Sequence, residues 1–443
     1  MKVRPTWFHA LIVLCLAVCT HARADTPPKT VCGRLTQVDG LTVLEVWGTP
    51  QEAGFAHGYL LADRLVGLFD EAVLAPEVGA APEVYEAMLL PAVRQRFIWE
   101  PRYEEELAGL LRGMQARLGP DGVRSQRLDR DLTVDDLKLV NSLADWHGVF
   151  CSSFAAWGAC TVDGDTLGGR NLDYPSTRNM QQAQILLVHR NSESARAWVG
   201  VTWPGLIGVY TAMNDEGVTI AMHDATGEPT TALVELTPRT LTLREALEGA
   251  ASVTFIDDVR RVLEHRRTLI GNNIMVTAPN IPGRPPAAVF EYDGNSRDHG
   301  VTLRLADAAA AQSPLDFLCC TNHMRSRKPP SDCRRYDTLT TGLRDALNPD
   351  HKLDPPAALR LIQSAVQRTT LHTVVFAPAR RTLYVQIPAL GDGAVEFNLA
   401  DCLQRPCDPT PITAGSVPPT RAPSSTAART TPATTAPATK DHP

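Results

Sequence analysis

The sequence is 443 residues long, with 44% hydrophobic and 21% charged residues and a formal net charge of −6. A chain of this length and composition can bury a large core, either as one large domain or as two modest ones. A negative net charge argues against nucleic acid and anionic membrane surfaces as partners, because both attract basic patches. Small neutral or mixed molecules remain as candidate substrates.

Residues 1–24 have the pattern of an export signal. Two basic residues precede an apolar run, residues 10–18, and Ala22-Arg23-Ala24 supplies the small residues of a cleavage site. We therefore expect a secreted or periplasmic protein whose mature chain begins at Asp25. We expect no permanent membrane span, because the apolar run is shorter than the roughly 20 residues that a bilayer requires. The bulky Val18 argues against a lipid anchor at Cys19.

Residues 54–147 show helical periodicity, and we expect the N-terminal segment 25–150 to be mostly helical. Thr133 is placed to cap one of these helices. The apolar positions that share a helix face are Leu61, Leu65, Leu68 and Phe69 in the first half, and Leu137, Val140, Leu143 and Ala144 in the second.

Strands are expected after residue 151, within a β-rich segment 151–408. Four stretches are rich in β-branched residues and are separated by Gly, Pro, Asn and Asp. They are residues 183–190, 195–203, 206–214 and 217–224.

Helices are predicted again at Leu243–Arg266, at Cys333–Leu347 and after Asp354, and residues 373–387 predict a late hairpin. Helices and strands in separated runs favour an α+β fold over a doubly wound parallel sheet. Residues 409–443 are almost entirely Pro, Thr, Ala and Ser, a composition that predicts a disordered tail.

The ten cysteines become eight if the export signal is removed. Export permits disulfides, and the spacing is compatible with a Cys402–Cys407 bridge or with one from Cys333 to Cys319 or Cys320. The sequence does not determine which of these pairs forms.

The stretch CSSFAAWGACTVDGDTLGGRNLDY, residues 151–174, contains the candidate chemistry. A thiol acts as a nucleophile only as its thiolate or beside a base, and the local base nearest Cys151 is His147. Papain-like proteases, which use a Cys–His pair, carry a characteristic sequence around the cysteine, and HGVFCSSF does not match it. If the Phe150–Cys151 peptide bond is cut, the new α-amine can serve as the base, because its pKa of about 7.7–8.0 leaves part of it unprotonated at neutral pH.

The sequence resembles N-terminal nucleophile hydrolases of the penicillin acyltransferase type (peptidase C45), which are related to choloylglycine hydrolases and acid ceramidase. The resemblance runs from about Glu52 to Ile387 through blocks in the same order. They are EAGFAHGYLLADRL (52–65), CSSF (151–154), TVDG (161–164) with GRNLD (169–173), WPGLIGVYTAMNDEG (203–217), CCTNHM (319–324) and SDCRRY (331–336).

The resemblance implies a four-layer αββα sandwich that is matured by cleavage between Phe150 and Cys151, with the two fragments staying associated. It implies that Cys151 is both nucleophile and base, that Arg170 stabilises the thiolate or the attacked carbonyl, and that Asp173 orients the α-amine. It further implies that Asn214 and Asn322 donate to the oxyanion and that Arg335 completes the charge network. The implied substrate is a small non-peptide N-acyl amide, and no cofactor or metal ion is implied.

Other interpretations of these residues stay open. Cys151 can be a structural thiol, Arg170 with Asp173 a simple ion pair, and Asn214 a turn residue. Arg170 and Asp173 are three residues apart and would point to opposite faces of a regular strand, so a common site requires the strand to bend.

Glu52 and His57 lack the spacing of a metal-binding helix, and we expect them to have structural roles. His57 lining the substrate cleft and His147 assisting self-cleavage are alternatives. A thiol peptidase, a phospholipase B-like lipid hydrolase and a catalytically silent binding module are the alternatives for the whole chain.

Overall fold

The computed structural model describes residues 29–74, 81–146, 148, 150–191, 195–228, 230–231, 233–305, 315–328 and 332–412. The predicted export signal, His147 and residues 413–443 of the predicted tail lie outside these ranges. Among the described residues, no helix has both the length and the apolar character needed to cross a bilayer.

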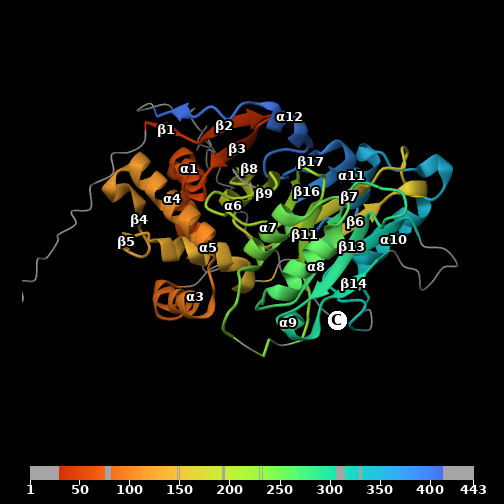
Figure 1. Ribbon diagram of the computed structural model, residues 1–443, viewed down its shortest axis with the longest axis horizontal. Coiled ribbons are helices and arrows are strands. Elements are labelled where there is room, and N and C mark those ends of the chain that lie inside the picture. Colours follow the sequence, from red (N-terminus) through yellow and green to blue (C-terminus); the bar gives the residue numbers. More distant parts are fainter. Residues whose placement is uncertain are drawn as a thin grey trace, which may run out of the picture.

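Two sheets dominate the described part of the chain (Figure 1). The larger sheet has nine strands, in the order β14 (Thr302–Arg304), β13 (Ala287–Tyr292), β12 (Asn272–Thr277), β11 (Thr219–Asp224), β10 (Thr211–Asn214), β9 (Trp198–Thr202), β8 (Ile185–Asn191), β3 (Leu41–Gly48) and β2 (Gly33–Val38). Its neighbouring strands are antiparallel except for β3 and β8, which run parallel. Strands from both sides of residue 150 therefore share one sheet.

The smaller sheet has six antiparallel strands among the described residues. Their order is β15 (Phe317–Cys320), β6 (Phe150–Ala156), β7 (Leu167–Asp173), β16 (Thr370–Ala377), β17 (Thr382–Gln386) and β18 (Val395–Asn398). The pairing of β16 with β7 shifts between Thr370 and His372, which marks a β-bulge in β16.

The two sheets pack against each other through apolar side chains and buried polar contacts. One shared cluster joins residues of β3, β8, β9 and β10 to residues of β16 and β17. The Ser153 hydroxyl on β6 lies 2.7 Å from His223 Nε2 on β11. Such contacts stabilise polar groups that are out of contact with water between the sheets.

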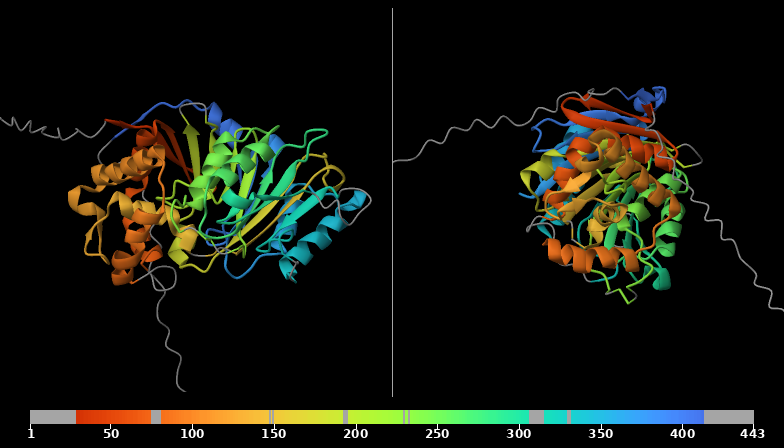
Figure 2. Two further views of the ribbon diagram at one scale, coloured as in Figure 1. Left: turned by 60° about the horizontal axis from the view of Figure 1, so that its bottom comes forward. Right: turned by 90° about the vertical axis from the view of Figure 1, so that its left-hand side faces the viewer.

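Helices cover the outer faces of both sheets (Figure 2). The nine-stranded sheet shares an apolar cluster with α1 (Pro50–Ala72), α4 (Pro101–Leu118), α5 (Val134–Trp146), α7 (Arg239–Gly249) and α8 (Phe255–His265). The six-stranded sheet shares another with α10 (Arg334–Asp345) and α11 (Pro355–Gln363). The predicted α+β class is confirmed.

The remaining strands and α-helices are short. They are β1 (Thr30–Val31) paired with β19 (Thr410–Pro411), β4 (Arg124–Ser125) paired with β5 (Arg130–Asp131), and the helices α2 (Pro82–Val84), α3 (Leu90–Arg96), α6 (Arg178–Gln182), α9 (Ser296–His299) and α12 (Leu399–Gln404). Because β19 pairs with β1, the chain remains ordered for the first few residues of the predicted tail.

Several predicted elements differ in extent. The helix predicted at 243–266 is two helices, α7 and α8, separated by residues 250–254. The strand predicted at 206–214 is only β10. The β2–β3 hairpin was not predicted, although its turn at Asp39-Gly40 has positive φ at both residues, a pattern typical of tight hairpins.

The eight described cysteines are free thiols, so the considered disulfides are absent. Cys402 and Cys407 are instead both in contact with Arg190, whose Nη1 donates to Cys407 Sγ at 3.2 Å and whose Nη2 lies 4.0 Å from Cys402 Sγ.

Glycines allow α1 and α4 to cross with their backbones in contact. A Cβ on Gly54 would lie 1.9 Å from the Glu106 carbonyl oxygen, and one on Gly58 would lie 1.9 Å from that of Leu110. No side chain fits at these distances. The EAGFAHG block thus owes its glycines to helix packing.

We expect Gly58→Ala to lower the free energy of unfolding by about 1–3 kcal/mol, because the methyl group would push α4 away from α1. Gly67 lies on the same helix with open space around its Cα. Gly67→Ala should therefore be neutral or stabilise the fold by up to about 1 kcal/mol. Urea unfolding of both variants measures the difference, and equal effects would contradict this account of the crossing.

Candidate active site

Cys151 is the second residue of β6, and its side chain is completely buried. Its peptide N–H donates to Asn322 Oδ1 at 2.9 Å, and its carbonyl oxygen accepts from Arg335 Nη1 at 2.6 Å. The backbone of this one residue is therefore held on both sides by side chains that the sequence analysis singled out.

The register of β15 and β6 explains the position of Asn322. Cys320 lies opposite Ser153 in this antiparallel pair. Continuing the same register by two residues brings Asn322 opposite Cys151. The Asn322 amide oxygen also accepts from Arg335 Nη2 at 2.8 Å, and its NH₂ group donates to the Asp224 carbonyl oxygen at 2.7 Å.

Arg335, in the first turn of α10, links three of the candidate residues. Besides Cys151 and Asn322, it approaches Asp173, with 3.4 Å between Nη1 and Oδ2. The neighbouring Arg334 is exposed to solvent.

Arg170 and Asp173 lie on opposite faces of β7, and the strand runs without interruption from Leu167 to Asp173. The expectation that this strand must bend is wrong, because the two side chains approach Cys151 from different sides. Arg170 shares the inner face with the thiol, and its Nε donates to Thr211 Oγ1 on the other sheet at 2.9 Å. Asp173 lies opposite Phe150 and reaches the backbone side of Cys151.

The structure does not bring Asn214 to this group. Its NH₂ donates to the carbonyl oxygens of Leu247 and Ala250, each at 2.9 Å. Its amide oxygen accepts from the backbone N–H groups of Glu216 and Val218. Asn214 is a turn residue that also tethers α7, and its amide hydrogens are already used.

The Cys151 thiol is a weak acid in the intact chain. Burial raises its pKa to about 11, although the positive charge of Arg170 opposes the rise. Burial also raises the pKa of the Asp173 carboxyl group, against the Thr370 hydroxyl and the Arg335 charge. An ionised thiol therefore needs a base beyond those around it in the intact chain.

Two residues of the site were not predicted from the sequence. The Thr370 hydroxyl donates to Asp173 Oδ1 at 2.5 Å, and the bulge in β16 turns the chain directly after it. Asp224 ends β11, receives the Asn322 amide and forms an ion pair with Arg239. Asp224 could have been suspected, because it is a carboxylate at the end of a predicted strand. Thr370 could not, because a single sequence does not reveal a β-bulge.

Glu52 and His57 have structural roles. Glu52 and Thr49 form a reciprocal capping box at the start of α1. His57 Nε2 accepts from the Gly205 backbone N–H at 2.9 Å, and burial lowers its pKa to about 4, so the ring is neutral. Within the described residues, no group of three or more His, Cys, Asp or Glu side chains is arranged to hold a metal ion.

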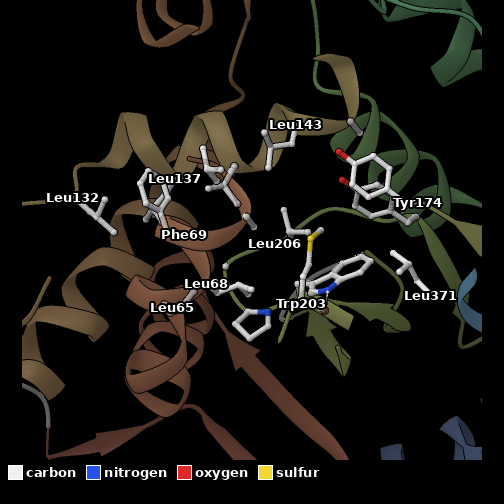
Figure 3. A pocket seen from close by; sticks show the side chains of 18 of the residues that line it. Leu65, Leu68, Phe69, Leu132, Leu137, Leu143, Tyr174, Trp203, Leu206 and Leu371 are labelled. Atoms are coloured by element: carbon white, nitrogen blue, oxygen red, sulfur yellow. Dashed lines mark hydrogen bonds between the residues drawn. The ribbon is translucent and has the colours of Figure 1, made fainter. Parts of the chain in front are cut away.

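An apolar pocket lies between α1, α5 and the end of β7 (Figure 3). With its open mouth it encloses about 920 Å³. Leu172, the cross-strand partner of Cys151, lines it, and Figure 3 shows Tyr174 and Leu371 away from the leucines of α1 and α5. Its walls therefore come from segments on both sides of the Phe150–Cys151 bond.

Comparisons with known proteins give distant likenesses. No protein-family model matches the sequence. The chain is 27% identical over 263 residues to an uncharacterized protein of Archaeoglobus fulgidus, and this match covers 54% of the chain and 42% of that protein. The chain thus spans less than half the length of this relative.

Three solved structures are similar at low identity. The Caenorhabditis elegans ortholog of N-acylethanolamine-hydrolyzing acid amidase is 18% identical, with a TM-score of 0.39 over 52% of this chain and 93% of that one. A conjugated bile acid hydrolase from Clostridium perfringens is 11% identical, with a TM-score of 0.40 over 61% and 100%. Penicillin V acylase from Agrobacterium tumefaciens is 13% identical, with a TM-score of 0.39 over 56% and 86%.

In the intact chain, the alkylation rate of Cys151 should rise about tenfold per pH unit between about pH 7 and pH 9, because only the thiolate reacts and its pKa lies higher. Mass spectrometry can follow the labelled peptide that still spans the Phe150–Cys151 bond. A rate that levels off below about pH 8 would contradict the weakly acidic thiol.

Proposed function

We propose that the chain is a cysteine N-terminal nucleophile hydrolase that cleaves the carbon–nitrogen bond of N-acyl amides with an apolar acyl group. The observation that carries this proposal is the position of Cys151. Its backbone is held by Asn322 and Arg335, its thiol lies on the same strand face as Arg170, and its cross-strand partner lines an apolar pocket.

We propose that maturation begins with attack of Cys151 Sγ on the carbonyl carbon of Phe150. The carbon–nitrogen bond breaks, the thiol proton passes to the nitrogen, and the acyl group moves to sulfur. Water then hydrolyses the thioester, which leaves a carboxylate on Phe150 and a free thiol on Cys151. The 57% exposure of Phe150 supports this step, since it leaves water access to the bond.

In the proposed mature enzyme, the new α-amine takes the proton from the thiol. Its pKa of about 7.7–8.0 suits this task at neutral pH, whereas the intact chain offers only a peptide N–H. Asp173, opposite Phe150 in the strand pair, would accept a hydrogen bond from the amine and orient it. Arg170 would stabilise the thiolate by its charge.

The thiolate attacks the substrate carbonyl, and the carbonyl oxygen gains negative charge. Asn322, whose side chain contacts the Cys151 backbone, is the candidate donor to this oxyanion. The Asn214 side chain instead binds the carbonyl oxygens of Leu247 and Ala250. The amine leaves with a proton, and water or an acceptor amine releases the acyl group from sulfur.

The pocket supports an apolar acyl group as the recognised part of the substrate. Its lining is mostly apolar and is dominated by leucine side chains, as is typical of sites that bind apolar small molecules. Burying each methylene of an acyl chain there contributes about 0.8 kcal/mol to binding.

We also propose that the protein is a four-layer αββα sandwich and that it is exported. Two facing sheets with helices on both outer faces support the four-layer αββα sandwich. The N-terminal fragment 25–150 would stay associated with the rest because β3 pairs with β8 and because α1 and α5 line the shared pocket. The signal-like N-terminus supports export.

Cys151→Ala tests both the self-cleavage and the amide hydrolysis. We expect the wild-type protein to yield two fragments, the larger of which begins at Cys151, and the variant to remain one chain with activity lowered by several orders of magnitude. N-terminal sequencing and denaturing gels measure the cleavage. A wild-type chain that stays whole and hydrolyses N-acyl amides would contradict self-cleavage, and an active Cys151→Ala variant would contradict the nucleophile.

Ala144 on α5 lines the pocket, and Ala144→Phe should obstruct it. We expect the KM for long-chain N-acyl amides to rise about tenfold or more, while an N-acetyl amide is hydrolysed as before. Ala87→Phe is the matched control, because Ala87 is exposed to solvent and does not line the pocket. An equal loss of activity on substrates with long and short acyl groups would contradict the role of the pocket in binding the acyl group.

A further inference from the structure

A chain of buried hydrogen bonds runs from Arg170 on β7 to Thr211 on the other sheet and back to His372 on β16. Arg170 Nε donates to Thr211 Oγ1 at 2.9 Å, and Thr211 Oγ1 lies 2.9 Å from His372 Nε2. His372 Nδ1 lies 2.7 Å from Gln184 Oε1. All four side chains are buried, with at most 1% of any of them exposed.

The hydrogen-bond directions in this chain follow from Gln184. Its NH₂ donates to the carbonyl oxygens of Gln181 and Leu371, each at 2.9 Å, so its amide oxygen faces the His372 ring. An amide oxygen only accepts, and therefore His372 Nδ1 carries the proton. Burial and the nearby Arg170 hold the pKa of His372 well below its usual value, so the ring is neutral and Nε2 accepts.

The same reasoning fixes the Thr211 hydroxyl. Its only hydrogen points to His372 Nε2, which leaves its oxygen lone pairs for Arg170 Nε–H. If the hydroxyl hydrogen pointed toward Arg170 instead, it would meet the Arg170 Nε–H, and two donors would face each other. His372 thus decides the orientation of the group that receives Arg170.

The Thr211 bond limits what the Arg170 guanidinium can do. Nη1 approaches the Asn171 carbonyl oxygen at 3.3 Å, and Nη2 has no hydrogen-bond partner among the described residues. A planar group held at Nε and Nη1 has no freedom to rotate, so Nη2 and the charge stay in place. Burial raises the pKa of the Cys151 thiol, and this positive charge is the largest influence that lowers it.

The bulge in β16 places His372 in this chain. Thr370 lies opposite Asp173 and His372 lies opposite Leu172, so the extra residue between them sends the two side chains to opposite faces. Thr370 binds Asp173 on one side of Cys151, and His372 faces Thr211 on the other.

We propose that Thr211 and His372 are positioning residues, which hold Arg170 in the orientation that stabilises the Cys151 thiolate. This inference rests on the proposed nucleophilic role of Cys151. It assigns neither residue a direct contact with the substrate.

Matched variants separate positioning from packing. Thr211→Val removes the hydroxyl at nearly constant volume, and Thr211→Ser keeps it. His372→Gln keeps an acceptor near the position of Nε2, whereas His372→Asn keeps only the group near Nδ1. We expect Thr211→Val and His372→Asn to slow the alkylation of Cys151 by iodoacetamide at about pH 7 by about two- to tenfold, and Thr211→Ser and His372→Gln to react like the wild type.

The full pH profile of alkylation is the deciding measurement, because it requires no amide substrate and stays informative if the proposed activity is not found. The slow variants should shift the profile to higher pH without lowering its plateau. In a substrate assay they should lower kcat and leave KM unchanged. Identical profiles for all variants, or equal losses in both members of a pair, would overturn the inference.

Discussion

The site depends on the register of β6 between β15 and β7. This register sets Cys151 opposite Leu172 on one side and in line with Asn322 on the other. Because side chains alternate along a strand, a slip of one residue would turn the thiol out of the space between the sheets and away from Arg170. Apolar residues that face the second sheet, such as Ala155 and Leu172, fix the register through their burial.

Burial sets the chemistry as well as the register. It suppresses ionisation of the Cys151 thiol, and the compensating charge of Arg170 must itself be held by buried partners. The Thr211, His372 and Gln184 side chains form a continuous set of hydrogen bonds that ends on Arg170 Nε. The proposed cleavage adds the missing component, an amine base attached to the nucleophile itself.

The sequence predicted the α+β class, most of the helices and several strands, because these depend on local periodicity. It also pointed to Cys151, Asn322 and Arg335, which the structure brings together. It misassigned Asn214, since an asparagine that closes a turn and one that faces a substrate look alike in a single sequence. His372 could not be predicted, because the bulge that aims it depends on strand pairing across 200 residues of sequence.

The most direct test of the central claim is to quench the purified protein during turnover of a long-chain N-acyl amide and to map the trapped acyl group by mass spectrometry. The account predicts a thioester on a peptide whose first residue is Cys151 with a free α-amine. Turnover without an acyl group on this sulfur, or an acylated Cys151 that is still joined to Phe150, would contradict it.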